Sequence, residues 1–308
     1  MKKIGIVGGI RWPATVQYYS EICRRANTWD TESRQTGRPS APEIVIESLD
    51  MTRALALEGK DGNEESWERF DAYHRGALRR LETAGADVAV IASNSPHHRF
   101  DEIVRGIGIP VINILDTAAE ECRRVGARKV LVLGTALAMR SARFRAIFHK
   151  HGIDAVSPAS DVARARTVML IEELQRGRLK GSAVRMGKIA TASWPFAGEP
   201  VVCLACTGLP PAFPGLMTQA SFRYGGVTYI NTMASHIDAV LEYAGIAPEK
   251  RNPALKSSGP GRKKEFSVVS AAAAAAGRRS AAAGAGGADA AAADGTAATV
   301  EATTAAAR

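Results

Sequence analysis

The sequence has 308 residues, 46% of them hydrophobic, which is enough to bury the core of one or two domains. No apolar run approaches the roughly 20 residues of a membrane-spanning helix, and the short apolar stretch after two N-terminal lysines is not a signal peptide. We therefore expect a cytoplasmic protein with no membrane partner. The net charge is +9, but the basic residues are interspersed with acidic ones and the sequence has no nucleic-acid-binding motif. This pattern favours an anionic small substrate or a solvated surface over a nucleic-acid partner.

Strand and helix patterns alternate along the chain up to about residue 245. The ranges that we predict as strands are Ile4–Val7, Glu43–Ser48, Asp87–Ile91, Val111–Ile114, Lys129–Leu133, Val201–Leu204 and Val227–Ile230. The predicted helices are one after Gly9 that carries Tyr18, Tyr19, Ile22 and Cys23, then Glu65–Ala84, Thr117–Val125, Phe144–His151, Val168–Arg176, Ala183–Ser193 and Thr232–Tyr243. This alternation predicts an α/β fold with parallel sheets covered on both faces.

The composition changes after Ala244. The following residues are polar with Pro and Gly, and from Ser270 the chain is mostly Ala and Gly without an apolar period. Such a stretch has nothing to dock against a core, so we predict a disordered low-complexity tail over 249–308. Its nine basic and five acidic residues carry +4 of the net charge.

The four cysteines, Cys23, Cys122, Cys203 and Cys206, are too few and too scattered for a disulfide scaffold. The last two have the spacing of a redox or zinc pair, but no second Cys/His cluster completes a metal site. Cys203 also lies within an apolar run, where a thiol behaves as a small buried hydrophobe. We predict no metal.

Two segments more than a hundred residues apart look like the two halves of one site. Ala92–His97 follows the apolar run Val88–Ile91, and Ala205–Pro210 follows Val201–Leu204. Both turn through small hydroxyl-bearing residues at the carboxyl end of a strand, where catalytic groups collect in α/β sheets. Each segment alone is explained as well by a strand end and a helix cap, so a functional interpretation depends on the pairing.

The pairing suits inversion of a carbon next to a carboxylate, because one group must remove a proton from one face while another returns one on the opposite face. At a strand-to-helix turn Cys206 would face amide N–H groups that favour its thiolate. Small polar neighbours can hold the charge that develops on the carboxylate. The Gly8-Gly9 turn lets the backbone approach a small ligand but lacks dinucleotide or P-loop spacing. Thr15 either caps the next helix or donates to a carboxylate.

Taken in order, the motifs resemble the aspartate/glutamate racemase family, whose members work without pyridoxal phosphate. The segments that carry the resemblance are Ile4–Ile10 with Pro13-Ala14-Thr15 and Tyr18-Tyr19, Ala86–His97, Gly134-Thr135 with Met139, Cys206–Pro210, and Asn231-Thr232 with His236. The match spans residues 1 to about 245 and does not cover the tail.

The resemblance implies two similar Rossmann-like α/β domains with parallel sheets, an active site in the cleft between them, no cofactor, and a homodimer. On this basis the first domain comprises 1–110 and 225–248, and the second comprises 111–224. The resemblance assigns the two acid/base positions to Ser93 and Cys206. The implied substrate-binding residues are Gly8, Gly9, Thr15, Arg53, Asn94, Ser95, Thr135, Arg164, Arg166 and Thr207, with Arg53 and either Arg164 or Arg166 on a distal carboxylate.

Three positions depart from the family pattern. Ser93 stands where the family usually has its first cysteine, and a hydroxyl is a far weaker acid than a thiol, whose pKa is about 8.5. Gly208 and Asn231 replace a usual glutamate and aspartate. The leading interpretation is a racemase for aspartate or glutamate with an asymmetric Ser/Cys pair. The alternatives are a one-cysteine decarboxylase or lyase, like the arylmalonate decarboxylases of the same superfamily, and a non-catalytic protein that keeps the cleft.

Overall fold

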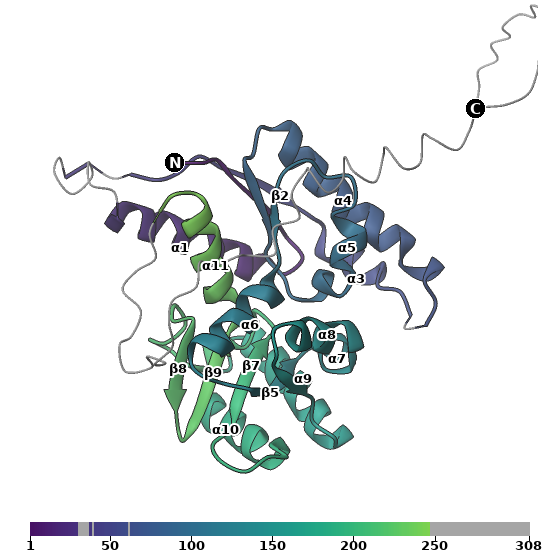
Figure 1. The fold of residues 1–308 in the computed structure, drawn as a ribbon, viewed down its shortest axis with the longest axis vertical. Coiled ribbons are helices and arrows are strands. Elements are labelled where there is room, and N and C mark those ends of the chain that lie inside the picture. The colour runs from purple at the N-terminus through teal and green to yellow at the C-terminus, as the bar shows by residue number, and fades with distance from the viewer. Residues whose placement is uncertain (30–36, 39, 61, 247–308) are drawn as a thin grey trace, which may run out of the picture.

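The computed structural model describes residues 1–29, 37–38, 40–60 and 62–246, and forms two sheets with helices on their faces (Figure 1). The predicted tail lies outside the described residues. The strands are β1 (Ile4–Gly8), β2 (Ile44–Ser48), β3 (Val88–Ile91), β4 (Val111–Ile112), β5 (Lys129–Gly134), β6 (Asp154–Val156), β7 (Val201–Ala205), β8 (Ser221–Tyr224) and β9 (Val227–Asn231). The first sheet has the order β2-β1-β3-β4 and the second β6-β5-β7-β9-β8.

Every strand pair in the first sheet is parallel. In the second sheet β5, β6, β7 and β9 are parallel, and β8 adds an antiparallel edge. The predicted α/β fold with mainly parallel sheets is therefore confirmed. The two sheets also share one winding order, because β1, β2, β3 and β4 correspond in position to β5, β6, β7 and β9.

Helices follow most strands. They are α1 (Trp12–Trp29), α3 (Met51–Ala56), α4 (Glu68–Thr83), α5 (Phe100–Ile103), α6 (Ile114–Arg124), α7 (Ala136–Arg140), α8 (Ala142–Lys150), α9 (Asp161–Gln175), α10 (Ser182–Ser193) and α11 (Thr232–Tyr243). The described residues also form short 3-10 helices at η1 (Glu65–Trp67), η2 (Ser95–Arg99) and η3 (Pro210–Ala212). Among the described residues no helix is both long and apolar enough to cross a membrane.

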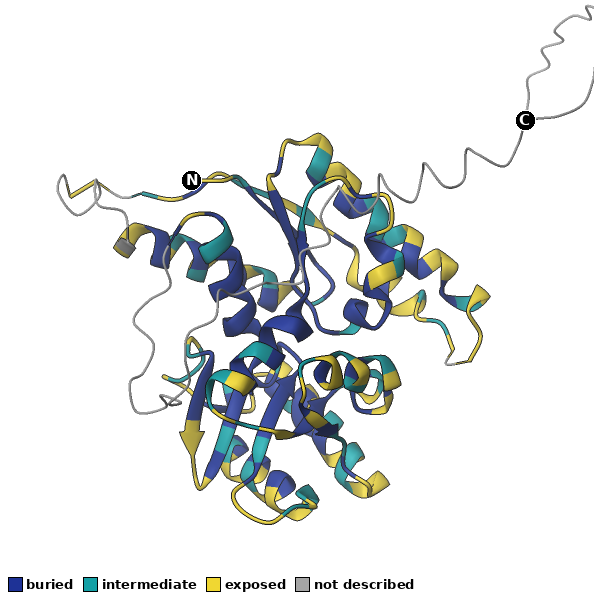
Figure 2. Ribbon diagram, viewed as in Figure 1, coloured by how far each residue is buried: buried dark blue, intermediate teal, exposed yellow. Residues whose placement is uncertain are grey.

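Alternating side chains of each inner strand pack into cores on opposite faces of its sheet. In β3, Val88 and Val90 join the core beneath α1 and α11, whereas Ala89 and Ile91 join the core beneath α4. A strand with both faces covered is apolar throughout, which is why these strands appear in the sequence as continuous hydrophobic runs. Figure 2 shows the inner strands buried together with much of α6 and α11, whereas the end of the edge strand β8 and the outer faces of the other helices are exposed. Cys203 lies fully buried in β7, as its apolar run predicts.

The strands do not divide between the sheets at the predicted domain boundaries. β4 begins at Val111 and belongs to the first sheet, and β9 at Val227–Asn231 belongs to the second. A tight hairpin at Gly225-Gly226 holds β9 beside β8, and α11 then returns to pack on α1 and β3 of the first half (Figure 1). Alternation in a sequence predicts that strands and helices exist, but it does not say which sheet a strand joins.

Candidate active site

The two segments singled out from the sequence lie at equivalent places in the two sheets. Ser93 follows β3 by two residues, and Cys206 follows β7 directly. β3 pairs with β1 in the first sheet and β7 pairs with β5 in the second, and both β1 and β5 end in glycine. The carboxyl ends of neighbouring parallel strands open on the same edge, where α/β proteins bind ligands.

Ser93 is buried, and its backbone is fixed at both ends. Its N–H donates to the Ile91 carbonyl at 2.8 Å, and its carbonyl accepts from His97 Nδ1 at 2.8 Å. Ser93 lines a cavity of about 190 Å³ together with Ser95 and Thr135. The structure therefore brings together three of the predicted hydroxyl residues, two from the first half and one from the second.

Cys206 is only 3% exposed, and burial raises the pKa of its thiol. Two features oppose that rise: the Gly208 N–H donates a hydrogen bond to the sulfur, and the positive charge of Arg11 lies within electrostatic range. Thr207 and Gly208 line a second cavity, of about 300 Å³. Its walls come from both halves, because Met51 and the start of α1 close it from the other side.

A short chain of hydrogen bonds joins the two segments. Asn94 Nδ2 donates to Thr232 Oγ1 at 3.1 Å, and Thr232 Oγ1 donates to the Leu204 carbonyl at 2.9 Å. Leu204 is in β7, two residues before Cys206, so Thr232 connects the Ser93 turn to the strand that carries Cys206. Asn94 Oδ1 is buried and has no hydrogen-bond partner among the described residues. Asn94 thus has a structural role through its amide nitrogen, and a free acceptor in its amide oxygen.

The glycine turn after β1 is held by Thr15. Gly9 has φ +80°, a left-handed conformation, and donates its N–H to Thr15 Oγ1 at 2.9 Å. A Cβ at Gly8 would lie 2.4 Å from Thr15 Cγ2, so these two residues can approach so closely only because Gly8 has no side chain. Neither glycine lines the two cavities. Thr15 therefore has neither of the two expected roles here: it lies within α1 rather than capping it, and its hydroxyl accepts from the glycine turn.

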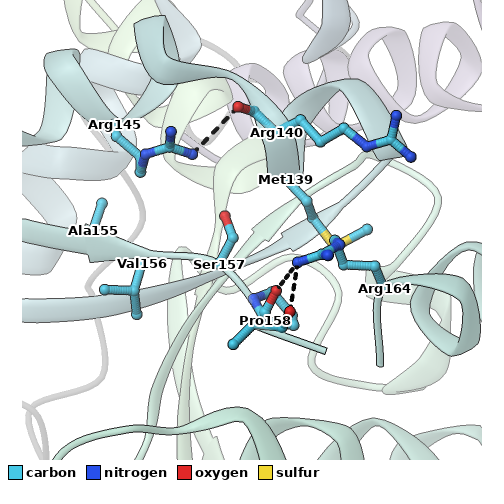
Figure 3. A pocket seen from close by; sticks show the side chains of 9 residues that line it. Met139, Arg140, Arg145, Ala155, Val156, Ser157, Pro158 and Arg164 are labelled. Atoms are coloured by element: carbon cyan, nitrogen blue, oxygen red, sulfur yellow. Dashed lines mark hydrogen bonds between the residues drawn. The ribbon is translucent and has the colours of Figure 1, made fainter. Parts of the chain in front are cut away.

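The three arginines expected at a distal carboxylate line neither cavity. The Arg53 guanidinium lies over the Tyr73 ring, 4.7 Å from its centroid. Arg164 donates to the carbonyls of Pro158 and Ala159 and pairs with Asp161, beside a different cavity of about 640 Å³ (Figure 3). Arg166 is exposed on α9.

Two buried histidines near the site are neutral structural groups. His236 accepts from the Tyr18 hydroxyl at 2.7 Å and donates to the Ile112 carbonyl at 2.9 Å, and burial lowers its pKa to about 4. Burial also holds the pKa of His97 well below its usual range. Among the described residues no histidine or carboxylate forms a hydrogen bond with the Ser93 hydroxyl, so no resident base activates it.

The departures from the family pattern have local explanations. Asn231 Oδ1 accepts from the Ala234 N–H to cap α11, while its Nδ2 donates to the Met217 carbonyl at 2.7 Å, which an aspartate could not do. A Cβ at Gly208 would start 3.3 Å from Gln175 Nε2 and 3.6 Å from Cys206 Sγ. A side chain at 208 would therefore begin in close contact with the amide of Gln175.

Two residues of the cavities were not anticipated, Arg11 and Glu58. Arg11 lines both cavities, and Glu58 lines the one that contains Ser93. Burial raises the pKa of Glu58, and the charge of Arg11 acts against that rise. The signal for Glu58 is helical spacing: Met51, Ala54, Leu55 and Glu58 recur at i, i+3, i+4 and i+7 and all face the cavities. Arg53 lies off that face.

Solved structures of two-domain Asp/Glu racemases share this fold. An aspartate racemase homologue from Pyrococcus horikoshii OT3 is 30% identical, with a TM-score of 0.62 over 80% of this chain and 100% of its own. The aspartate racemase of Picrophilus torridus is 20% identical, with a TM-score of 0.60 over 81% of this chain and 97% of its own. A glutamate racemase from Campylobacter jejuni is 15% identical, with a TM-score of 0.51 over 81% of this chain and 88% of its own. At these lower identities the likeness shows the fold alone.

A sequence model of one family also matches most of the chain. The model is that of the Asp/Glu/Hydantoin racemases, and it covers residues 7–240. The chain therefore belongs to the Asp/Glu/Hydantoin racemase family, in agreement with the motifs that carry the resemblance in the sequence.

Proposed function

We propose that the protein is a cofactor-independent racemase of aspartate or glutamate in which Ser93 and Cys206 act from opposite sides of the substrate. The observation that carries this proposal is the equivalent placement of the two residues at the ends of β3 and β7, beside cavities whose walls come from both halves. Membership of the family and the racemase fold support it.

The proposed reaction needs one proton removed and one delivered. The Cys206 thiolate takes the α-proton, so that an S–H bond forms while the Cα–H bond breaks and its electron pair moves into the carboxylate as an enediolate. The Ser93 hydroxyl delivers its proton to the opposite face of Cα. Proton transfer through solvent from the Cys206 thiol to the Ser93 oxygen then restores the starting state. In the reverse direction the Ser93 oxygen, after it has given its proton to the Cys206 thiolate through solvent, takes the α-proton, and the Cys206 thiol delivers a proton to the opposite face.

The small polar residues around the two groups would bind the α-carboxylate. Ser95 and Thr135 line the cavity with Ser93, and Thr207 lines the cavity beside Cys206. Hydroxyl donors fixed before the reaction stabilise charge that develops on a carboxylate oxygen. Asn94, with its free buried Oδ1, would accept a hydrogen bond from the substrate ammonium. The homodimer remains part of the proposal.

The test is the conversion of single enantiomers. The full chain is incubated separately with L- and D-aspartate and L- and D-glutamate, and the products are separated by chiral chromatography, with Cys206→Ala as the inactive control. We expect the opposite enantiomer to form from at least one of these amino acids. If none is converted, and deuterium from D₂O enters none of them at Cα, these substrates are excluded.

One observation favours a second candidate, a one-thiol decarboxylase. The Ser93 hydroxyl has no base beside it among the described residues, whereas Cys206 has both a donor and a cation in range. A substituted malonate would lose CO₂, the electron pair of the broken C–C bond would form an enolate, and the Cys206 thiol would protonate it. Release of CO₂ from a substituted malonate, without conversion of amino acids, would select this alternative. Binding with neither reaction would select a non-catalytic protein.

A further inference from the structure

Arg11 is the one residue common to the linings of the two cavities beside Ser93 and Cys206. It follows the Gly8-Gly9 turn at the carboxyl end of β1 and directly precedes α1. That position places it between the two segments, on the edge of the sheet where the substrate would bind. Its side chain is partly exposed.

Arg11 is also the single cation of both linings, because the remaining lining residues are apolar or uncharged polar apart from Glu58. Arg99, in the 3-10 helix that follows Ser93, is by contrast already paired with Asp71. Within the described residues no carboxylate forms an ion pair with Arg11, and Glu58 acts on it only at longer range. A partly buried guanidinium without a carboxylate partner is ready to bind one from a ligand.

We propose that Arg11 binds the side-chain carboxylate of the substrate, so that the site is built for dicarboxylic amino acids. This proposal rests on the proposed function for the place of the α-carbon, between Ser93 and Cys206. The uncharged donors Ser95 and Thr207 suit the α-carboxylate, whose charge must remain free to spread during the reaction. A second carboxylate carries a full charge throughout, and in these cavities only Arg11 can neutralise it.

The same placement gives Arg11 an effect on the thiol. Its charge favours the Cys206 thiolate, and it also acts on Glu58, which lines the Ser93 cavity with it. Loss of the charge should therefore move thiolate formation to higher pH. A residue that merely supported the backbone of the glycine turn would not produce that shift, so the thiol serves as an independent reporter of where the guanidinium lies.

The test compares ligands that differ by one carboxylate and needs no turnover. Binding of succinate and of butyrate to the full chain is measured by calorimetry for the wild type, Arg11→Met and Arg11→Lys, with the exposed helical Arg79→Met as a matched control. We expect Arg11→Met to weaken succinate by about tenfold or more while butyrate is unchanged, and Arg11→Lys to recover part of the loss. The pH midpoint of Cys206 alkylation should rise in Arg11→Met and stay in place in Arg79→Met.

Three results would overturn the proposal. The first is a wild type that does not prefer succinate to butyrate, or that does not bind succinate at all. The second is unchanged succinate binding in Arg11→Met. The third is equal weakening of both ligands in Arg11→Met, which would assign Arg11 to the α-carboxylate. Failure of the proposed function gives a different pattern: succinate binding would still depend on Arg11, but neither aspartate nor glutamate would be converted.

Discussion

The Ser93 turn and the Cys206 turn occupy equivalent places in two sheets that have the same strand order. The Ser93 oxygen and the Cys206 sulfur nevertheless have different surroundings. The sulfur of Cys206 accepts the Gly208 N–H and lies within range of a guanidinium. Ser93 has its backbone fixed by His97, but no residue in the described part of the chain gives its hydroxyl comparable support. The fold therefore supplies two equivalent positions, and the atoms placed there decide which of them can hold a negative charge.

This difference predicts unequal roles for the two positions. A thiol can be ionised near neutral pH when donors and cations favour it, whereas a serine hydroxyl without a base stays protonated. Cys206 would therefore take and give protons in both directions, and Ser93 would limit the rate at the other face. Substitutions at the two positions should reveal this inequality.

Removal of the thiol should have the largest effect. Cys206→Ala leaves no group able to take the α-proton, so we expect racemisation to fall by about a thousandfold or more. Cys203→Ala is the matched control, because that thiol is buried within β7 and faces the core. Rates are measured by chiral chromatography. Similar activity in Cys206→Ala and the wild type would remove Cys206 from the mechanism.

Making the two turns chemically alike should have the next largest effect. Ser93→Cys replaces the weaker acid with a thiol at the same strand end, and we expect the rate of inversion to rise by about tenfold. Ser93→Ala should abolish inversion while one enantiomer still exchanges its α-proton with solvent. If Ser93→Cys is slower than the wild type and equally stable, the limiting role of the hydroxyl is wrong.

The pH dependence should follow the Cys206 thiol. Burial raises its pKa, so the active thiolate fraction is small at neutral pH and grows as pH increases. We expect the rate to rise by about tenfold per pH unit through neutrality and to level off only above about pH 8.5, the usual thiol value. A rate profile that is already flat below pH 7 would show that burial does not control this thiol.

The hydrogen bonds between the two turns should have the smallest effect. Thr232→Val removes the hydroxyl that accepts from Asn94 and donates to the Leu204 carbonyl, leaving buried groups without partners. We expect the free energy of unfolding to fall by about 1–3 kcal/mol in a denaturant titration. Thr232→Ser keeps the hydroxyl and should retain most of that stability. Equal stability of the valine and serine variants would mean that the bridge contributes nothing.

Much of the fold could be predicted because the inner strands are apolar on both faces. Runs such as Val88–Ile91 and Val201–Leu204, each ending in small polar residues, reveal both the strands and the paired turns. Short elements carry a weaker signal, and the helix α3 (Met51–Ala56) and the edge strand β8 (Ser221–Tyr224) were missed. Long side chains are the least predictable, since their direction depends on neighbours distant in the sequence.

The arginines illustrate this last limit. Arg53 follows from the family motif, but its guanidinium packs on Tyr73, a neighbour on α4 that the local sequence does not identify. Arg11 follows the Gly8-Gly9 turn, in a segment whose functional interpretation depended on its glycines. Its position between two cavities depends on both halves of the fold. Predicting which strand ends form the site therefore proved easier than predicting which charges reach it.

Deuterium incorporation from single enantiomers tests most directly whether two different groups act on opposite faces. One enantiomer of the substrate is incubated in D₂O, and both the product and the remaining substrate are analysed by mass spectrometry and NMR before equilibrium. Action from opposite faces predicts deuterium at Cα of the product while the remaining substrate stays protonated. Deuterium in the remaining substrate, without formation of the other enantiomer, would show that Cys206 acts alone and would contradict the paired site.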